Sequence, residues 1–323
     1  MVSAEEQQGL VLSSCRRCPS GCRRQIRFHK VLCYIFNMPK LYKTMFSISL
    51  VLMLAALAVF LIYGLNLGID FTGGSLLEIR TQNIELRSVR ESLEKAGISN
   101  AAISQTENGF LIKMPEISEE KHQEILVELQ QFGEIEEIRF DSIGSTIGQE
   151  LKNKSIAAIV IALILISLYL AIVFSRISET ISPWVLALGA FVALLHDLLL
   201  PAGVFSLLGK LRGVAIDAPM IAAALAILGY SINDTVVVYD RIRENIIKNP
   251  GADFNSNVHK SIKQVLVRSM NTTLTTLFAV IAIYIFGGPT LKNFSLALII
   301  GIASGAYSSI FVASPVLMLF YKK

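Results

Sequence analysis

The chain has 323 residues, of which 53% are hydrophobic and 17% charged, and its mean hydropathy is +0.57. This composition is typical of a membrane protein rather than a soluble one. The net charge of +4 is spread along the chain, without a basic surface that has interleaved aromatic residues, so we expect no nucleic acid partner.

Residues 1–44 are a predicted cytoplasmic arm, of which residues 1–37 lack hydrophobic periodicity. All four cysteines lie there, and together with one histidine they offer conceivable zinc ligands: Cys15, Cys18, Cys22, Cys33 and His29. The first three are too closely spaced for easy tetrahedral coordination, so we expect no metal site. Because Met38 stands directly before the first apolar run, residues 1–37 are either a disordered arm or the result of a misassigned start.

Six apolar runs are long enough to cross about 30 Å of hydrocarbon, which takes about 20 helical residues. They cover residues 45–67, 154–174, 183–208, 217–238, 272–288 and 293–320. Lysines and arginines gather before the first run and in a predicted cytoplasmic loop, 239–271, while the connection 209–216 has only Lys210 and Arg212. The positive-inside rule therefore predicts that both termini are cytoplasmic.

The first run, 45–67, predicts an uncleaved anchor, because it is longer than a signal-peptide core and lacks a small-residue cleavage site. It would deliver residues 68–152 to the outside of the membrane. This segment opens with GIDFTGG, residues 68–74, whose glycines permit φ > 0 and a close backbone approach. A turn that leaves the membrane is the simplest interpretation of this sequence.

The outside segment has the pattern of a small α+β domain in the order βαββαβ. Alternation predicts strands at 75–81, 101–106, 110–114 and 134–140, and helical spacing predicts helices at 84–96 and 118–132. Asn108-Gly109 predicts a hairpin. The order is that of a ferredoxin-like domain. Its one histidine, His122, lies on a charged helix face and is expected to be solvated, so we predict a binding or moving part without enzymatic activity.

Residues 153–323 predict a five-helix transmembrane bundle. The third span of the chain, which is the second helix of this bundle, contains His196-Asp197, and Pro201 is expected to kink the helix four residues later. Adjacent helical positions point about 100° apart, so the two side chains are not expected to share a face. A proton relay and a helix-packing hydrogen bond both remain open. In the sixth span, Gly301 to Gly305 with the serines that follow predicts a face for close helix contact without a chemical role.

The fourth span carries a carboxylate where lipid is expected. Asp234 lies in GYSINDTVVVYDRIRE, residues 229–244, with polar neighbours and a charge cluster at the cytoplasmic end: Ser231, Asn233, Thr235, Asp240 and Arg241. Placing a charge at bilayer depth costs about 3 kcal/mol, so such residues usually face a bundle interior, a cavity or a proton path. Burial disfavours the ionised carboxyl and a nearby cation favours it, so a modest rearrangement could load and unload a proton. Alternatively, Asp234 only holds two helices together.

Arg268 opens the fifth span in the sequence RSMNTT and enters the membrane from the side of Asp234. A pair between the two would form a two-state element that responds to protonation; the alternative is an arginine that extends to the headgroups. Helical spacing of apolar residues in the 239–271 loop is compatible with a helix on the membrane surface. No G-x-x-x-x-G-K-[ST] sequence is present, so protons are the expected coupling ion and no other cofactor is predicted.

Four motifs, in order, resemble the SecD/SecF family of protein-export membrane proteins, in its SecF branch. They are GIDFTGG after the first span, LLHD in the third, GYSINDTVVVYDRIRE in the fourth and RSMNTTLTT in the fifth, and the resemblance extends over about residues 40–320. It implies a fold of the resistance-nodulation-division type, in which SecD supplies six further spans. Asp234 and Arg268 match the family's proton-pathway residues, and the base of its external domain is matched by Asp70, Phe71, Gly73 and Gly74.

The resemblance also implies a function in the bacterial cytoplasmic membrane. SecD and SecF, with the SecYEG channel and with YajC and YidC as further candidate partners, use the proton-motive force to pull preproteins outward. The membrane carboxylate of SecD is absent here, so this chain alone is not expected to form a complete proton path. A small-molecule or lipid exporter of the same fold remains an alternative, as does a structural adaptor for SecD, for which Asp234→Asn would retain export.

Overall fold

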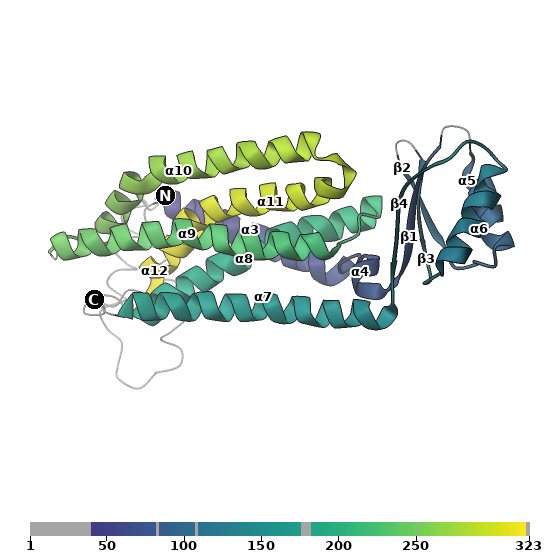
Figure 1. Ribbon diagram of the computed structural model, residues 1–323. Coiled ribbons are helices and arrows are strands. Elements are labelled where there is room, and N and C mark those ends of the chain that lie inside the picture. Colours follow the sequence, from purple (N-terminus) through teal and green to yellow (C-terminus); the bar gives the residue numbers. More distant parts are fainter. Residues whose placement is uncertain (1–39, 82–83, 107–108, 176–181, 250, 321–323) are drawn as a thin grey trace, which may run out of the picture.

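A computed structural model describes residues 40–81, 84–106, 109–175, 182–249 and 251–320. Long helices form a bundle, and a small α+β domain lies against one end of it (Figure 1). The first described helix begins, and the last one ends, at the opposite end of the bundle (Figure 1). The cysteines of the predicted arm lie outside the described residues.

The described chain contains six helices long and apolar enough to cross a membrane, which confirms the predicted number. They are α3 (Lys40–Tyr63), α7 (Ser145–Val173), α8 (Pro183–Arg212), α9 (Ala218–Lys248), α10 (Phe254–Phe286) and α11 (Gly288–Ser308) with its continuation. A π-helix, η2 (Ser309–Ala313), continues α11 into α12 (Ser314–Phe320). A short helix, α4 (Ile69–Thr72), follows α3.

The segment 239–271 was predicted to be a cytoplasmic loop, but most of it is helical. Helices α9 and α10 extend through most of it, and only residues 249–253 connect them. The apolar residues expected on the membrane surface instead pack against the end of α9, and those that are buried there are Val258, Ile262 and Val265. Asn245 of α9 donates to the Ser261 hydroxyl of α10 at 2.7 Å. Mutual burial of these faces therefore keeps both helices intact beyond the membrane-length segment.

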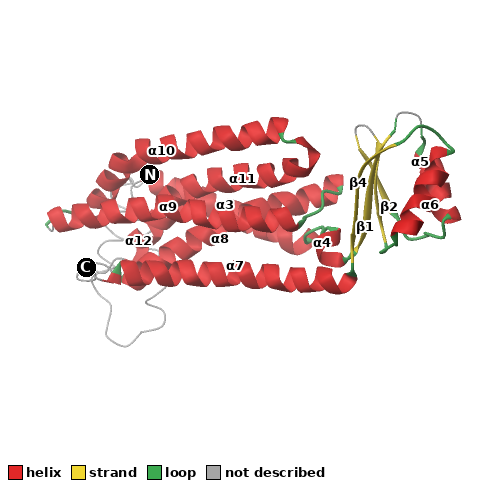
Figure 2. Cartoon of the chain, in the orientation of Figure 1, coloured by secondary structure: helices red, strands yellow, loops and turns green. Residues whose placement is uncertain are grey.

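The α+β domain comprises six elements: β1 (Gly74–Arg80), α5 (Leu86–Lys95), β2 (Ala102–Thr106), β3 (Gly109–Met114), α6 (Glu119–Gln130) and β4 (Glu136–Ile143). This is the predicted order. The strands pair antiparallel in the order β2-β3-β1-β4. Thr106 pairs with Gly109, so the predicted hairpin forms, although residues 107–108 of its turn are outside the described chain. Helices α5 and α6 cover one sheet face, and the bundle lies on the other side (Figure 2).

The prediction of a solvated His122 is wrong, because its side chain is only 3% exposed. Its ring stacks on Phe140 of β4, with centroids 3.7 Å apart and ring planes 3° from parallel. Nδ1 lies 3.1 Å from a carboxylate oxygen of Glu119. The charged neighbours along α6 suggested an exposed face, but the aromatic side chain from β4 covers the ring. His122 therefore fixes α6 to the edge strand of the sheet.

Glycine allows α8 to approach α3 closely in the bundle. A Cβ built at Gly203 would lie 2.7 Å from Cβ and 2.8 Å from Cα of Ala56. In real proteins a Cβ atom does not come this close to a non-bonded carbon atom. Any larger residue at position 203 must therefore push the two helices apart. Gly229 of α9 differs, because nothing lies within 4 Å of the Cβ that would be added there.

We expect Gly203→Ala to destabilise the bundle by about 1–3 kcal/mol, the usual cost of overpacking. The matched variant Gly229→Ala should leave stability unchanged or raise it slightly, since alanine favours the helix. Thermal unfolding of the purified protein in detergent measures both. Equal melting temperatures for Gly203→Ala and wild type would contradict the packing argument, and so would an equal loss in both variants.

Candidate functional site

Asp234 is buried in α9 and contacts α10. Its carboxylate is part of a side chain that is 3% exposed. One oxygen, Oδ2, accepts a hydrogen bond from the Ser269 hydroxyl at 2.6 Å and a longer one from Thr273 at 3.4 Å. Ser269 and Thr273 lie one turn apart on α10, so both hydroxyls point to the same place. Two neutral donors from a neighbouring helix thus stabilise the carboxylate.

Arg268 does not form the expected ion pair with Asp234 within the described chain. Its side chain is exposed, while its neighbour Ser269 is buried against the carboxylate. Successive helical residues point about 100° apart, so the position that faces Asp234 is taken by the serine. The guanidinium therefore lies next to the site but does not contact the carboxylate as an ion pair.

The other predicted residues of α9 separate into two groups. Ser231 and Thr235 are buried, whereas Asn233 is exposed. Asp240 and Arg241 form short-range ion pairs within α9 itself, with Arg243 at 3.3 Å and Glu244 at 2.6 Å. Partly exposed pairs of this kind contribute little to stability. They lie about 9 Å or more from Asp234 by helix rise and do not take part in its site.

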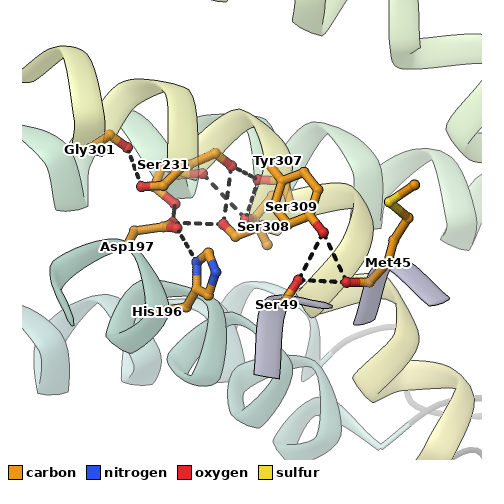
Figure 3. A network of polar contacts seen from close by, with 12 residues as sticks. Met45, Ser49, His196, Asp197, Ser231, Gly301, Tyr307, Ser308 and Ser309 are labelled. Carbon is orange, nitrogen blue, oxygen red and sulfur yellow. Dashed lines mark hydrogen bonds and ion pairs between the residues drawn. The ribbon is translucent and has the colours of Figure 1, made fainter. Parts of the chain in front are cut away.

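A second buried carboxylate, Asp197 of α8, forms the centre of a polar network (Figure 3). Its Oδ2 accepts hydrogen bonds from Ser231 of α9 at 2.5 Å and from Ser308 of α11 at 2.7 Å. His196 Nδ1 lies 2.9 Å from Oδ1. This single side chain therefore joins three helices, and both of its oxygens have hydrogen-bond partners, as buried polar groups usually do.

The expectation that His196 and Asp197 cannot share a face is wrong. Both are buried, at 1% and 0% exposure, and they contact one another. Rotation about the side-chain bonds brings the two polar ends together although their Cα–Cβ bonds diverge. The other ring nitrogen, Nε2, is buried and has no hydrogen-bond partner among the described residues. Helix α8 continues through Pro201 as one helix.

The sixth span makes polar contacts with other helices that its small-residue pattern did not indicate. Gly305 allows the predicted close contact, since a Cβ there would lie 3.0 Å from Cβ of Ser231. The next polar residues, however, reach into the network: Ser308 binds Asp197, and the Ser309 hydroxyl lies 2.9 Å from that of Thr235. The π-helix begins at Ser309. Such insertions are frequent at functional sites.

The network continues to the first span through Tyr307 (Figure 3). The Tyr307 hydroxyl donates to the carbonyl of Met45 at 2.9 Å and accepts from Ser49 at 3.1 Å. Its ring also stacks near that of His196, with centroids 6.3 Å apart. Helices α3, α8, α9 and α11 are thereby linked by side-chain hydrogen bonds inside the bundle.

The predicted base motif of the α+β domain lies against the start of α9. Oδ2 of Asp70 accepts a hydrogen bond from the backbone N–H of Ala218 at 2.6 Å. Phe71 is buried in a cluster with apolar residues of α8 and α9. Gly73 and Gly74 have φ values of 72° and 117°, which favour glycine. The motif is therefore more than a turn, because it contacts the helix that carries Asp234.

Three hydroxyl residues of these sites were not singled out individually from the sequence: Ser269, Thr273 and Ser308. Ser269 and Thr273 belong to the polar series after Arg268. Their spacing of four residues indicates that both side chains lie on the same face of the helix. Ser308 had only its place in a small-residue stripe. Among the described residues, no group of three His, Cys, Asp or Glu side chains could hold a metal ion.

Two family models match the chain. "Protein export membrane protein SecD/SecF, C-terminal" matches residues 122–323, and "SecD/SecF GG Motif" matches residues 58–83. The protein translocase subunit SecF of Thermobaculum terrenum is 40% identical over 86% of this chain and 92% of its own length. That of Pseudomonas aeruginosa is 36% identical over 84% of this chain and 87% of its own length.

Two solved structures of SecDF are also similar to this chain. The crystal structure of SecDF from Thermus thermophilus, a translocon-associated membrane protein, is 34% identical and superposes with a TM-score of 0.76 over 87% of this chain. A SecDF structure in a super-membrane-facing form gives a TM-score of 0.62 at 35% identity, over 86% of this chain. The chain spans 38% and 37% of these two structures. With six membrane-length helices and relatives that match most of its length, the chain belongs to the SecD/SecF family of protein-export membrane proteins.

Proposed function

We propose that this chain is the SecF-type subunit of the SecDF accessory complex of the Sec translocase. In this function it uses the proton-motive force to promote late-stage export of preproteins across the bacterial cytoplasmic membrane. The observation that carries the proposal is the Asp234 carboxylate, which is buried in the bundle and held by two hydroxyls of the adjacent helix. The names of the relatives, protein translocase subunit SecF, agree with it.

The contacts of Asp234 suggest how a proton would change the bundle. The ionised carboxylate accepts hydrogen bonds from Ser269 and Thr273 and so attracts α10 to α9. Hydrogen bonds to a charged acceptor are about twice as strong as neutral ones, so protonation weakens this attachment. Arg268, exposed beside the site, is the cation that would approach or leave as the charge changes. Proton transfer at Asp234 would thus alter the packing of α9 against α10.

The proposed partners and membrane orientation of the chain are those of the SecD/SecF family. The chain corresponds to little more than a third of the Thermus thermophilus SecDF structure, so a SecD partner would supply the rest, including SecD's own membrane carboxylate. SecYEG, YajC and YidC are further proposed partners, and preproteins are the substrate. Both termini would be cytoplasmic and the α+β domain external. Its strand order supports a ferredoxin-like domain.

For Asp197 we propose a packing role rather than proton transfer. Three donors from His196, Ser231 and Ser308 surround it. A buried polar network whose members are hydrogen-bonded favours one arrangement of the helices that carry it. It would hold α9 to α8 and α11 while the contact with α10 changes.

Asp234→Asn is expected to abolish the dependence of preprotein release on a proton gradient, because the amide cannot exchange a proton. The measurement uses vesicles that contain the complete channel complex and follows release of a preprotein with and without the gradient. We expect a gradient-dependent increase in wild type and none in the variant, while SecD still co-purifies.

Asp240→Asn is the matched control, because it makes the same change on the same helix at an exposed carboxylate. It should respond to the gradient like wild type. If Asp234→Asn also responds like wild type, then Asp234 only joins helices and the proton role is wrong.

Ser308→Ala should destabilise the protein by about 1–3 kcal/mol, because it leaves a buried carboxylate oxygen without one of its donors. Ser304→Ala is the control, since this buried hydroxyl bonds to the carbonyl of Gly301 in its own helix. Thermal unfolding in detergent compares the two. If both variants have the same melting temperature, the network around Asp197 does not hold the helices together.

A further inference from the structure

Helix α9 obtains its N-terminal cap from the base of the α+β domain. The residue that precedes it, Asp217, forms no side-chain cap hydrogen bond within the described chain. The acceptor is Asp70, which lies 148 residues earlier and binds the N–H of Ala218 at 2.6 Å. Caps are normally supplied by the flanking residue. Here the cap instead joins two parts of the molecule that are far apart in sequence.

Backbone hydrogen bonds strengthen the same contact. Gly68 N–H donates to the carbonyl of Ile216, and Ile216 N–H donates to the carbonyl of Asn66, both at 2.8 Å. From the sheet, the Lys113 ammonium donates to the carbonyl of Leu67 at 2.9 Å. The segment between α3 and β1 is thereby tied to the start of α9 and to β3 at the same time.

Asp70 is also fixed to the domain side. Helix α4, which carries it, leads through Gly73 directly into β1. A Cβ at Gly73 would lie 2.5 Å from Cα of Ser145, and one at Gly148 would lie 2.8 Å from the nitrogen of Gly73. Such close packing against α7 leaves α4 little freedom. The Asp70 carboxylate therefore joins the start of α9 to a segment that is packed tightly against α7 and continues into the sheet.

Five charged residues gather at this contact, and all of them are half-buried. Burial raises the pKa of the Asp217 carboxyl, and the charge of Asp70 raises it further. The cations Arg139 and Lys113 act against this shift, and Asp141 adds to it. Burial also lowers the pKa of Lys113. Five charged groups from the sheet, α4 and α9 thus meet in a partly desolvated joint.

We propose that Asp70 is a positioning residue that couples the α+β domain to α9, so that movement of this helix is passed to the domain. The inference rests on the proposed function, because it assigns the movement to proton transfer at Asp234. That residue lies about 24 Å further along α9 by helix rise, so the helix itself is the connecting element. Loss of the cap should uncouple the domain and leave the proton site intact.

Distance measurement by spin labelling tests the coupling. All native cysteines lie before residue 34, so they can be replaced without touching the described chain. Labels at Gln130 on α6 and Lys210 on α8, both exposed, report the distance between the domain and the bundle. The protein is assembled with SecD and the channel in vesicles, and the distance is recorded with and without a proton gradient.

Two variants remove the cap from opposite sides. Asp70→Ala removes the acceptor, and Ala218→Pro removes the N–H donor at a position where proline suits the start of a helix. Asp70→Asn keeps an amide oxygen as acceptor and serves as the conservative rescue. Asp253→Ala is the matched control, because Asp253 caps α10 in the same way, through the N–H of Ser256, without touching the domain.

Wild type, Asp70→Asn and Asp253→Ala should show the same gradient-dependent distance change. Asp70→Ala and Ala218→Pro should lose more than half of it. If either of these variants folds and moves like wild type, the coupling through Asp70 is wrong. If wild type does not respond to the gradient, or Asp234→Asn responds as wild type does, the proposed proton-driven function fails and the coupling fails with it.

Discussion

Carboxylates fix helix α9 at three points, and the rest of the structure depends on this arrangement. Asp70 caps its first turn, Asp197 binds Ser231 along its length, and its own Asp234 binds α10. An ionised group inside a bundle is tolerated only where donors surround it, so each contact dictates which helix must lie beside α9. Three carboxylate contacts, together with the apolar clusters, thus place α9 in the bundle.

The three contacts differ in how readily they can change. Asp197 has donors from its own helix and from two others, whereas Asp234 depends on hydroxyls from α10 alone. The Asp234 contact is therefore the one that a proton would most easily release. The exposed neighbour Arg268 suits the proposed function of this site, at a boundary with a SecD partner.

Apolar run lengths, strand alternation and the buried Asp234 were sufficient to predict six spans, the βαββαβ order and one candidate site. The sequence did not predict contacts between distant helices: Ser308 resembled a packing residue, and Asp70 resembled part of a turn. His122 and the 239–271 segment were misjudged for a related reason, since tertiary burial by β4 and by α9 outweighed local charge. Local patterns specify which faces are polar, but not what covers them.

The protonation of Asp234 can be observed directly by infrared difference spectroscopy of the complex between high and low pH. A carboxyl group that gains a proton produces a C=O stretching band, and replacement by asparagine identifies its source. We expect a band in wild type that is absent in Asp234→Asn and retained in Asp197→Asn. A band that persists in Asp234→Asn and disappears in Asp197→Asn would contradict this expectation, as would the absence of any carboxyl band.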